Sequence, residues 1–440
     1  MKKITALLIA ALLALSLCGC EQIEQLKQIE LPTPSVEPSE EPSPEPSEEP
    51  EATPEPTPEA AEPSSYVTIS IGEHKETYYA PDDENQMILD FSYETPTVHI
   101  YGNDAASEKI NDFIAAMDEE YYTGSNYAEG GYGVGINGML DMAYDNLSYV
   151  RDNNIEANLT LASNRTVLVA RADEKLISLL YNDYSYTGGV HGSYGYTGYI
   201  FDTETGEQLT LDKLAPDLDA FKTWLTAAMV EKVNSDDELK QSLTVDDVET
   251  ALAALIREGS WYLDGDGLTV FSSVYEIAPY AAGVINFKFS YDEIAPYIDS
   301  KWLPAARTGS GELEALTLDA LPEGTEIIDK VTVDSGETQL CIKVSGAVYD
   351  VSVSSVEYAD FDSRFYTTGE HWYCSYMKDS AIQLETMIPD GIPNLMVSYT
   401  DADGVNHSKL VSQSGMDGSF LLIDDNIVLK KLQLSILMLI

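Results

Sequence analysis

Short runs in which apolar and polar residues alternate recur along most of this 440-residue chain, and they constrain its fold more than any other feature. A strand that buries one face of a sheet has this period of two, so each run predicts a β-strand. Before residue 305 the runs are Val67–Ile71, Phe91–Tyr101, Asn158–Leu161, Thr166–Ala170, Leu176–Tyr186, Tyr194–Phe201, Leu268–Phe271 and Val284–Phe289. Pro96 is expected to break the second strand, because proline has no backbone N–H to donate to a ladder.

Three segments of the same region carry the helical period instead. In 105–122, four apolar residues share one face at three- and four-residue spacing: Ile110, Phe113, Ile114 and Met117. Leu218–Val233 and Val245–Arg257 are amphipathic in the same way, whereas residues 124–138 contain six glycines and are expected to form a flexible surface loop. Over about residues 66–304 the sequence therefore predicts an α+β fold, with a mixed antiparallel sheet and segregated helices.

The pattern changes near residue 305, where helical periods disappear. Alternating runs continue, separated by turn residues, at Glu326–Val333, Gln339–Val344, Tyr349–Val356, Leu395–Tyr399 and Lys409–Val411. Residues 305–440 are therefore expected to form a smaller all-β module, a sandwich. The apolar end of the chain, 426–440, is shorter than the roughly 20 residues that a membrane-spanning helix needs, so we expect a buried strand there.

The first residues have the pattern of an export signal. Lys2 and Lys3 precede the apolar run Ile4–Leu17, which ends in Leu17-Cys18-Gly19-Cys20. This ending resembles a bacterial lipobox. The resemblance implies that residues 1–19 are removed and that Cys20 carries a lipid, anchoring the chain to the outer face of the cytoplasmic membrane. The alternative is an ordinary secretory signal followed by a coincidental cysteine.

Residues 20–65 have the composition of a disordered stalk. From residue 21 they hold 11 of the 20 prolines and 13 glutamates against one lysine. Such a segment buries too little apolar surface to fold, and its charge keeps it extended. The whole chain has a formal net charge of -51, which excludes a general nucleic-acid binder because phosphate contacts need clustered Lys and Arg. The same charge permits a cationic partner.

Cleavage at the lipobox would leave two cysteines besides Cys20. Cys341 and Cys374 would lie in a compartment that permits disulfides, and they either form one or remain free thiols.

One segment carries more information than the rest: Tyr184-Ser185-Tyr186-Thr187-Gly188-Gly189-Val190-His191-Gly192. Gly188 and Gly189 allow a turn with positive φ between two strands rich in tyrosine. A second segment, Tyr275-Glu276-Ile277-Ala278-Pro279-Tyr280-Ala281-Ala282-Gly283, precedes another strand. Together they resemble two signatures of an extracellular bacterial domain, which occurs in the anti-sigma-V factor and in the non-catalytic N-terminal region of the peptidoglycan deacetylase PdaC.

The resemblance implies how the region is divided. Residues 66–195 would form a PdaC-type N-terminal α+β domain, and residues 196–304 an RsiV-like C-terminal domain packed against it. In the anti-sigma-V factor, this region binds lysozyme. Deacetylase activity is not implied here, because the chain lacks an H-x-x-x-H pair and the T-F-D-D-G type of motif. We therefore expect no catalytic residues, no metal and no cofactor.

The tyrosine-rich hairpin gives the candidate binding residues: Tyr184, Tyr186, His191, Tyr194 and Tyr196. On alternating positions, the tyrosines form either an exposed aromatic face for a ligand or half-buried packing. His191 is either a ligand-binding group or general base, or a turn residue bonded to the backbone.

These observations lead to one preferred functional hypothesis and one alternative. The preferred hypothesis is a non-enzymatic surface lipoprotein that senses or binds cell-wall glycan or a cationic wall-active protein such as lysozyme. The alternative is a peptidoglycan-modifying hydrolase, or a protein associated with deacetylation, that uses acidic residues or His191.

Overall fold

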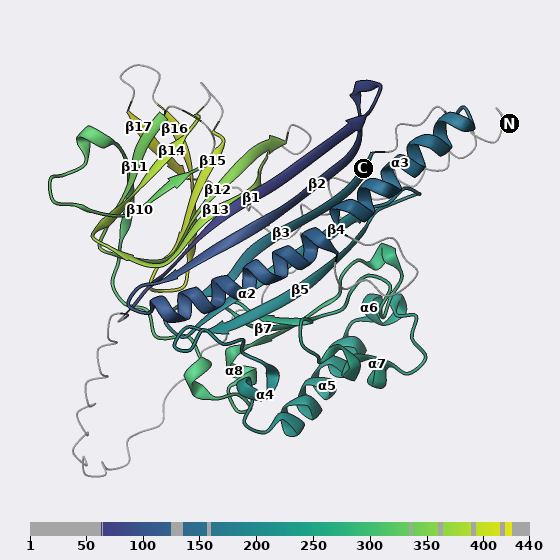
Figure 1. Ribbon diagram of the computed structural model, residues 1–440. Helices are drawn as coiled ribbons and strands as arrows, with labels where there is room; N and C mark the ends of the chain where they lie inside the picture. The colour runs from purple at the N-terminus through teal and green to yellow at the C-terminus, as the bar shows by residue number, and fades with distance from the viewer. Residues whose placement is uncertain are drawn as a thin grey trace, which may run out of the picture. The chain divides into compact units, whose positions relative to one another are not determined.

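The computed structural model of the chain (Figure 1) describes Pro63 and residues 65–124, 135–155, 160–333, 336, 338–359, 364–388, 393–413 and 419–424. The predicted signal peptide, Cys20 and almost all of the predicted stalk lie outside the described residues, as does the apolar C-terminal segment 426–440. None of the helices within the described ranges is long and apolar enough to cross a membrane.

A ten-stranded sheet runs through both halves of the described chain and confirms the α+β fold class. Its order is β17-β16-β15-β12-β13-β1-β2-β3-β4-β5, and its pairs are antiparallel except the parallel pair β2–β3. The strands from the N-terminal half are β1 (Val67–Ala80), β2 (Asp83–Ile100), β3 (Leu161–Ala172), β4 (Leu176–Tyr186) and β5 (Ser193–Asp202). Those from the C-terminal half are β12 (Ala347–Ala359), β13 (Arg364–Lys378), β15 (Leu395–Thr400), β16 (Asn406–Gln413) and β17 (Phe420–Asp424).

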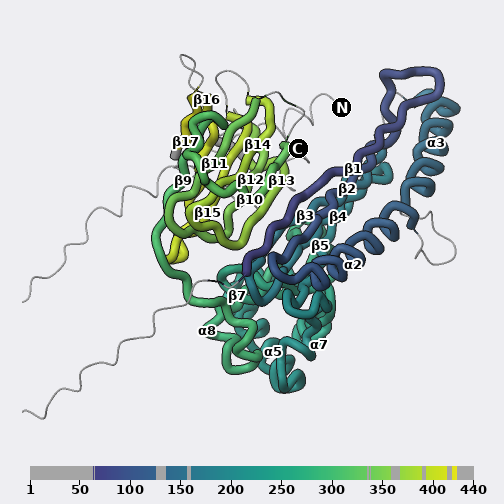
Figure 2. Tube along the Cα trace, turned by 60° about the vertical axis from the view of Figure 1, so that its left-hand side comes forward, coloured from purple at the N-terminus to yellow at the C-terminus, as the bar shows by residue number. Residues whose placement is uncertain are grey.

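Two helices connect β2 to β3, and only the first was expected from the sequence. α2 (Asp104–Thr123) begins where the side chain of Asn103 accepts the N–H of Ala106, and it runs beside β2 in both views (Figures 1 and 2). α3 (Ile136–Asp152) occupies part of the predicted glycine-rich loop, whose residues 125–134 lie outside the described ranges. The loop prediction was wrong from residue 136 onward, because an apolar stripe at helical spacing begins at Ile136 and outweighs Gly138 within the helix.

Pro96 does not break β2, which was the second error of the sequence prediction. β2 continues through Pro96, which lies opposite Ile71 on β1. On its other edge, β2 pairs with β3 only from Leu89 to Tyr93. Beyond that point the edge faces α2, so a residue without an N–H leaves no ladder bond unmade.

Where β2 and β3 separate, side chains replace the ladder. On β2, the backbone N–H of Val98 donates to Asn111 Oδ1 of α2 at 2.8 Å. On β3, the N–H of Val167 donates to Glu94 at 2.7 Å, and the N–H of Val169 donates to Glu370 at 3.4 Å. Buried backbone N–H groups need acceptors. On β2 the acceptor is the Asn111 amide, and on β3 the acceptors are the carboxylates of Glu94 and Glu370.

The segment that follows β5 and extends to residue 304 forms a second layer of structure. The helices are α4 (Leu211–Leu214), α5 (Leu218–Ser235), α6 (Asp237–Ser242), α7 (Val248–Leu255) and α8 (Tyr291–Ile294), and a small sheet holds β6 (Trp261–Leu263), β7 (Gly267–Phe271) and β8 (Asn286–Ser290). Their apolar faces share one core with Leu176 and Ile200 of the large sheet. The predicted helix Val245–Arg257 is shorter than expected: α7 begins at Val248, where the Asp247 side chain caps it by accepting the N–H of Thr250.

The C-terminal part is a β-sandwich whose second sheet is β10-β14-β11-β9. These strands are β9 (Glu312–Thr317), β10 (Glu326–Thr332), β11 (Thr338–Ser345) and β14 (Ser380–Thr386). β13 pairs with β1, so the large sheet continues across residue 305, where the sequence predicted the start of the module.

Cys341 and Cys374 are free and buried, so the disulfide alternative is not realised. Cys374 lies in the sandwich core together with Leu340 and Ile342 of β11. Cys341 lies between Leu340 and Ile342 on the same strand. Because successive side chains of a strand point to opposite faces, its thiol points away from that core. The two thiols therefore lie on opposite sides of β11.

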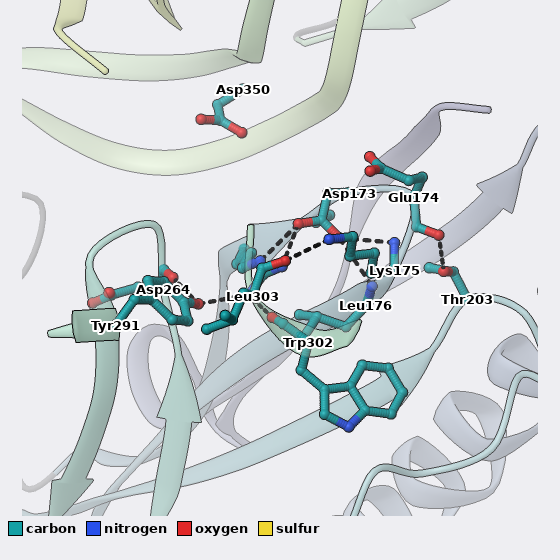
Figure 3. A network of polar contacts seen from close by, with 12 residues as sticks. Asp173, Glu174, Lys175, Leu176, Thr203, Asp264, Tyr291, Trp302, Leu303 and Asp350 are labelled. Carbon is teal, nitrogen blue, oxygen red and sulfur yellow. Dashed lines mark hydrogen bonds and ion pairs between the residues drawn. The ribbon is translucent and has the colours of Figure 1, made fainter. Parts of the chain in front are cut away.

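Arg171 on β3 ties the large sheet to the second layer through contacts with Asp173, Tyr291 and Trp302, which Figure 3 shows. Its side chain is 5% exposed and pairs with Asp173 at 2.6 Å. It also donates to Tyr291 Oη at 2.6 Å and to the carbonyl of Trp302 at 2.9 Å. Lys175 reaches the carbonyl of Leu303 at 2.6 Å in the same network. These contacts fix the segment that leads into the sandwich.

Candidate functional site

The predicted tyrosine-rich hairpin is the β4–β5 pair, with the two adjacent glycines at its turn. Gly188 and Gly189 have φ of 93° and 117°, which glycine adopts without the steric cost of a side chain. Tyr184 lies opposite Tyr194 across the two strands. A Cβ atom on Gly192 would lie 2.4 Å from the ring of Tyr184, so this glycine lets the ring lie across the returning strand.

The second motif forms a tight turn between β7 and β8. The N–H of Glu276 donates to the carbonyl of Ser273 at 3.2 Å, and the N–H of Ser273 donates to Glu276 Oε2 at 2.8 Å. Tyr275, the third residue of this turn, has φ of 65°. A side chain in this left-handed region costs about 1–2 kcal/mol, and turns of this kind favour glycine there.

The fold brings the two motifs together. The ring of His191 stacks on Tyr280 with centroids 4.0 Å apart and an interplanar angle of 19°. Tyr275 Oη lies 3.3 Å from His191 Nε2, and the Tyr275 and Tyr280 rings are 5.5 Å apart. We call His191, Tyr275 and Tyr280 the aromatic platform.

Hydrogen bonding fixes the tautomer of His191. Nδ1 lies 2.8 Å from the carbonyl oxygen of Gly192, so it must carry the hydrogen that is donated there. In the neutral ring, Nε2 is then an acceptor, and the hydroxyl of Tyr275 is its donor. The backbone bond matches the turn-residue alternative, yet the ring also takes part in the platform.

The platform lies at an exposed part of the surface. The side chain of Tyr275 is 62% exposed. Val190, which precedes His191 at the tip of the hairpin, is 96% exposed. Tyr194 is only 9% exposed and packs edge-to-face beneath Tyr280 with centroids 5.8 Å apart. The site therefore has an exposed upper ring layer supported by a buried one.

The five residues predicted from the sequence divide between these layers. His191 is exposed in the platform, whereas Tyr194 lies beneath it, and Tyr196 packs against Phe271 in a small core cluster. Tyr184 lies against Gly192, and Tyr186 donates to the carbonyl of Gly189 at 3.0 Å. Tyr194 and Tyr196 thus follow the half-buried alternative.

Burial acts on three tyrosine hydroxyls of the site. Burial raises the pKa of Tyr280, and the neighbouring Tyr275 raises it further. Burial likewise raises the pKa of Tyr184 and of Tyr194. The rings of the platform offer apolar faces to a ligand, and their hydroxyls offer hydrogen-bonding groups.

The second motif also contacts the connection between α6 and α7, which carries acidic residues. The N–H of Thr244 donates to the carbonyl of Ile277 at 3.0 Å, which brings the connection between α6 and α7 beside the Tyr275 turn. Asp246 and Asp247 in this connection are exposed. Within the described ranges, no group of three or more His, Cys, Asp or Glu side chains is arranged to hold a metal ion.

Tyr275 and Tyr280 are functional candidates that the sequence prediction missed. Both lie in the second motif, which marked the family resemblance, but nothing in the sequence placed them on His191. The available signal was the joint occurrence of two aromatic motifs, each next to a turn.

Comparison with known proteins identifies one part of the chain. Residues 209–292 match the family model described as "Protein of unknown function (DUF3298)". The chain carries a DUF3298 domain. The domain holds Tyr275 and Tyr280, whereas His191 precedes it. The matched range lies within residues 196–304, and at this coarse level it agrees with the RsiV-like resemblance.

Two solved structures are similar to part of the chain. A DUF3298 family member from Bacteroides fragilis is 18% identical, with a TM-score of 0.40, over 53% of this chain and 94% of that chain. A DUF3298 family protein from Pseudomonas aeruginosa is 15% identical, with a TM-score of 0.36, over 54% of this chain and 97% of that chain. No curated protein matches the sequence.

Proposed function

We propose that the chain is a non-enzymatic, lipid-anchored surface protein whose aromatic platform binds cell-wall glycan. The observation that carries the proposal is the meeting of His191, Tyr275 and Tyr280 from two motifs that are 84 residues apart. Three rings packed together at an exposed turn offer apolar faces for sugar C–H groups and hydroxyls for sugar oxygens. The lipobox supports the location at the outer face of the membrane.

The strained backbone of Tyr275 supports a role for its ring. Glycine would relieve the left-handed conformation, yet the position holds a large side chain that is 62% exposed. Because the ring is largely exposed, it buries little apolar surface on folding and adds little to stability. Folding alone therefore gives no reason for a tyrosine at this position. A ligand that stacks on the ring gives one.

The acidity of the chain supports a second candidate, a cationic wall-active protein such as lysozyme. The chain as a whole is strongly acidic, and Asp246 and Asp247 are exposed in the connection whose Thr244 bonds the carbonyl of Ile277. Opposite charges would accelerate association and make it sensitive to salt. Glycan binding through rings would depend weakly on salt.

Titration calorimetry with muropeptides and with lysozyme, at low and high salt, tests both candidates. For a muropeptide, we expect binding that is lost in Tyr275→Gly and little changed by salt. Tyr149→Ala is the matched control, since Tyr149 is 61% exposed on α3. Lack of binding to both ligands would refute the binding role, and release of acetate or sugar that disappears in His191→Ala would favour the enzyme alternative.

A further inference from the structure

We propose that Arg257 and Glu276 position Tyr275, and thereby control the affinity of the aromatic platform. The affinity part of this inference rests on the proposed function, whereas the positioning part concerns the protein without ligand. Both residues lie in the DUF3298 domain, outside the platform itself.

Glu276 closes the turn that holds Tyr275 in its left-handed conformation. Its backbone N–H and its side chain both bond Ser273, so the two ends of the turn are joined twice. Without such constraints, a tyrosine would relax toward negative φ, because the left-handed region is strained for any residue with a Cβ. One oxygen of the Glu276 carboxylate, Oε2, therefore helps to hold the turn in this conformation by accepting the N–H of Ser273.

Arg257 holds the other oxygen of the same carboxylate. Arg257 Nη1 lies 2.7 Å from Glu276 Oε1 and also donates to the carbonyl of Ala254 at 2.9 Å. Ala254 belongs to the last turn of α7, where carbonyl groups lack helical partners and favour a cation. The guanidinium thus links the end of α7 to the turn that carries Tyr275.

A second tie holds the following residue. The carbonyl of Ile277 accepts the N–H of Thr244 from the connection between α6 and α7. The two residues after Tyr275 are therefore fastened to the helices, one through a side chain and one through the backbone. The exposed ring of Tyr275 is presented by a rigid support and not by a free loop.

The contact most sensitive to this support is the one with His191. Tyr275 Oη and His191 Nε2 are 3.3 Å apart, at the long end of hydrogen-bond geometry. A small movement of the turn would break this bond while leaving the core intact. The Arg257–Glu276 pair itself is 45% and 26% exposed, so its direct contribution to global stability is expected to be small.

The test compares Arg257→Ala, Arg257→Lys and the wild type in the full-length protein. The first readout is the NMR signal of the His191 ring in the free protein, assigned with His191→Gln. The second is the dissociation constant for a chitin oligosaccharide or muropeptide. Arg151→Ala is the matched control, since Arg151 of α3 is 42% exposed and pairs with Asp82 at 2.7 Å.

We expect Arg257→Ala to shift the His191 signals and to weaken glycan binding about tenfold, which corresponds to one well-placed contact. Arg257→Lys should restore most of both, and Arg151→Ala should change neither. Unchanged His191 signals in Arg257→Ala would overturn the positioning role. If the wild type binds no glycan, the proposed function fails, and the His191 signals still decide whether Arg257 positions the turn.

Discussion

Replacing Glu94 by glutamine should stabilise the protein at pH 8 and leave it nearly unchanged at pH 4.5. Glu94 lies on β2, where the sheet separates, and its carboxylate accepts the N–H of Val167 on β3. Burial raises the pKa of Glu94 to about 7, and repulsion from Glu370 and Glu73 adds to the rise, while the bond from Val167 opposes it. Glu73 is its direct neighbour across the β1–β2 pair.

The sign follows from proton binding in the two states. Between its usual pKa of 4.5 and about 7, Glu94 keeps its proton in the folded protein and loses it in the unfolded chain. The folded state then binds more protons, so its stability falls as the pH rises through this window. One pKa unit corresponds to about 1.4 kcal/mol, so the contribution lost by pH 8 is about 3 kcal/mol at most.

Urea unfolding of the wild type and of Glu94→Gln, from pH 4.5 to pH 8, measures this contribution. Glutamine keeps an oxygen for the N–H of Val167 but cannot ionise, so the variant should gain about 2–3 kcal/mol over the wild type at pH 8. Glu84→Gln, a substitution at an exposed position on the same strand, is the control. A constant difference for Glu94→Gln across the range would refute the reasoning.

Three further outcomes follow from the described contacts. Tyr275→Gly should raise the free energy of unfolding by about 1 kcal/mol while abolishing glycan binding, because glycine relieves the left-handed backbone; thermal unfolding and calorimetry measure both effects. Arg171→Ala should lower the unfolding free energy by about 3–5 kcal/mol, because it leaves Asp173 without its buried partner; urea unfolding at neutral pH checks this. Cys341 and Cys374 should react with iodoacetamide only after unfolding, since burial raises the pKa of both thiols, that of Cys374 to about 12. Mass spectrometry of native and denatured samples measures the labelling, and labelling of the native protein would contradict this prediction.

Local sequence patterns predicted the hairpin of the site well. Alternation and the two glycines placed β4, β5 and their turn, because strand period and positive φ are local properties of the chain. The same rules failed where a neighbouring element of the fold decided the conformation. Pro96 lies within β2 because that edge of the strand faces α2, and no local rule contains this information.

Other misses have comparable causes. α3 was hidden by the glycines before it, although Ile136, Met139 and Ala143 already follow helical spacing. β13 shows no clean alternation, since it is a central strand whose successive residues from Trp372 to Ser375 are all buried. A sequence rule that expects one exposed face cannot find such a strand.

Local residue patterns were enough to predict the α+β class, the tyrosine-rich hairpin and an exported, acidic protein. The tertiary structure alone decided that His191 meets Tyr275 and Tyr280, that the two thiols face different sides of β11, and that carboxylates close the gap beside β3. The physical reason is the range of the forces involved. Backbone propensity acts over a few residues, whereas ring stacking, thiol pairing and burial of a carboxylate depend on atoms that only the completed fold brings together.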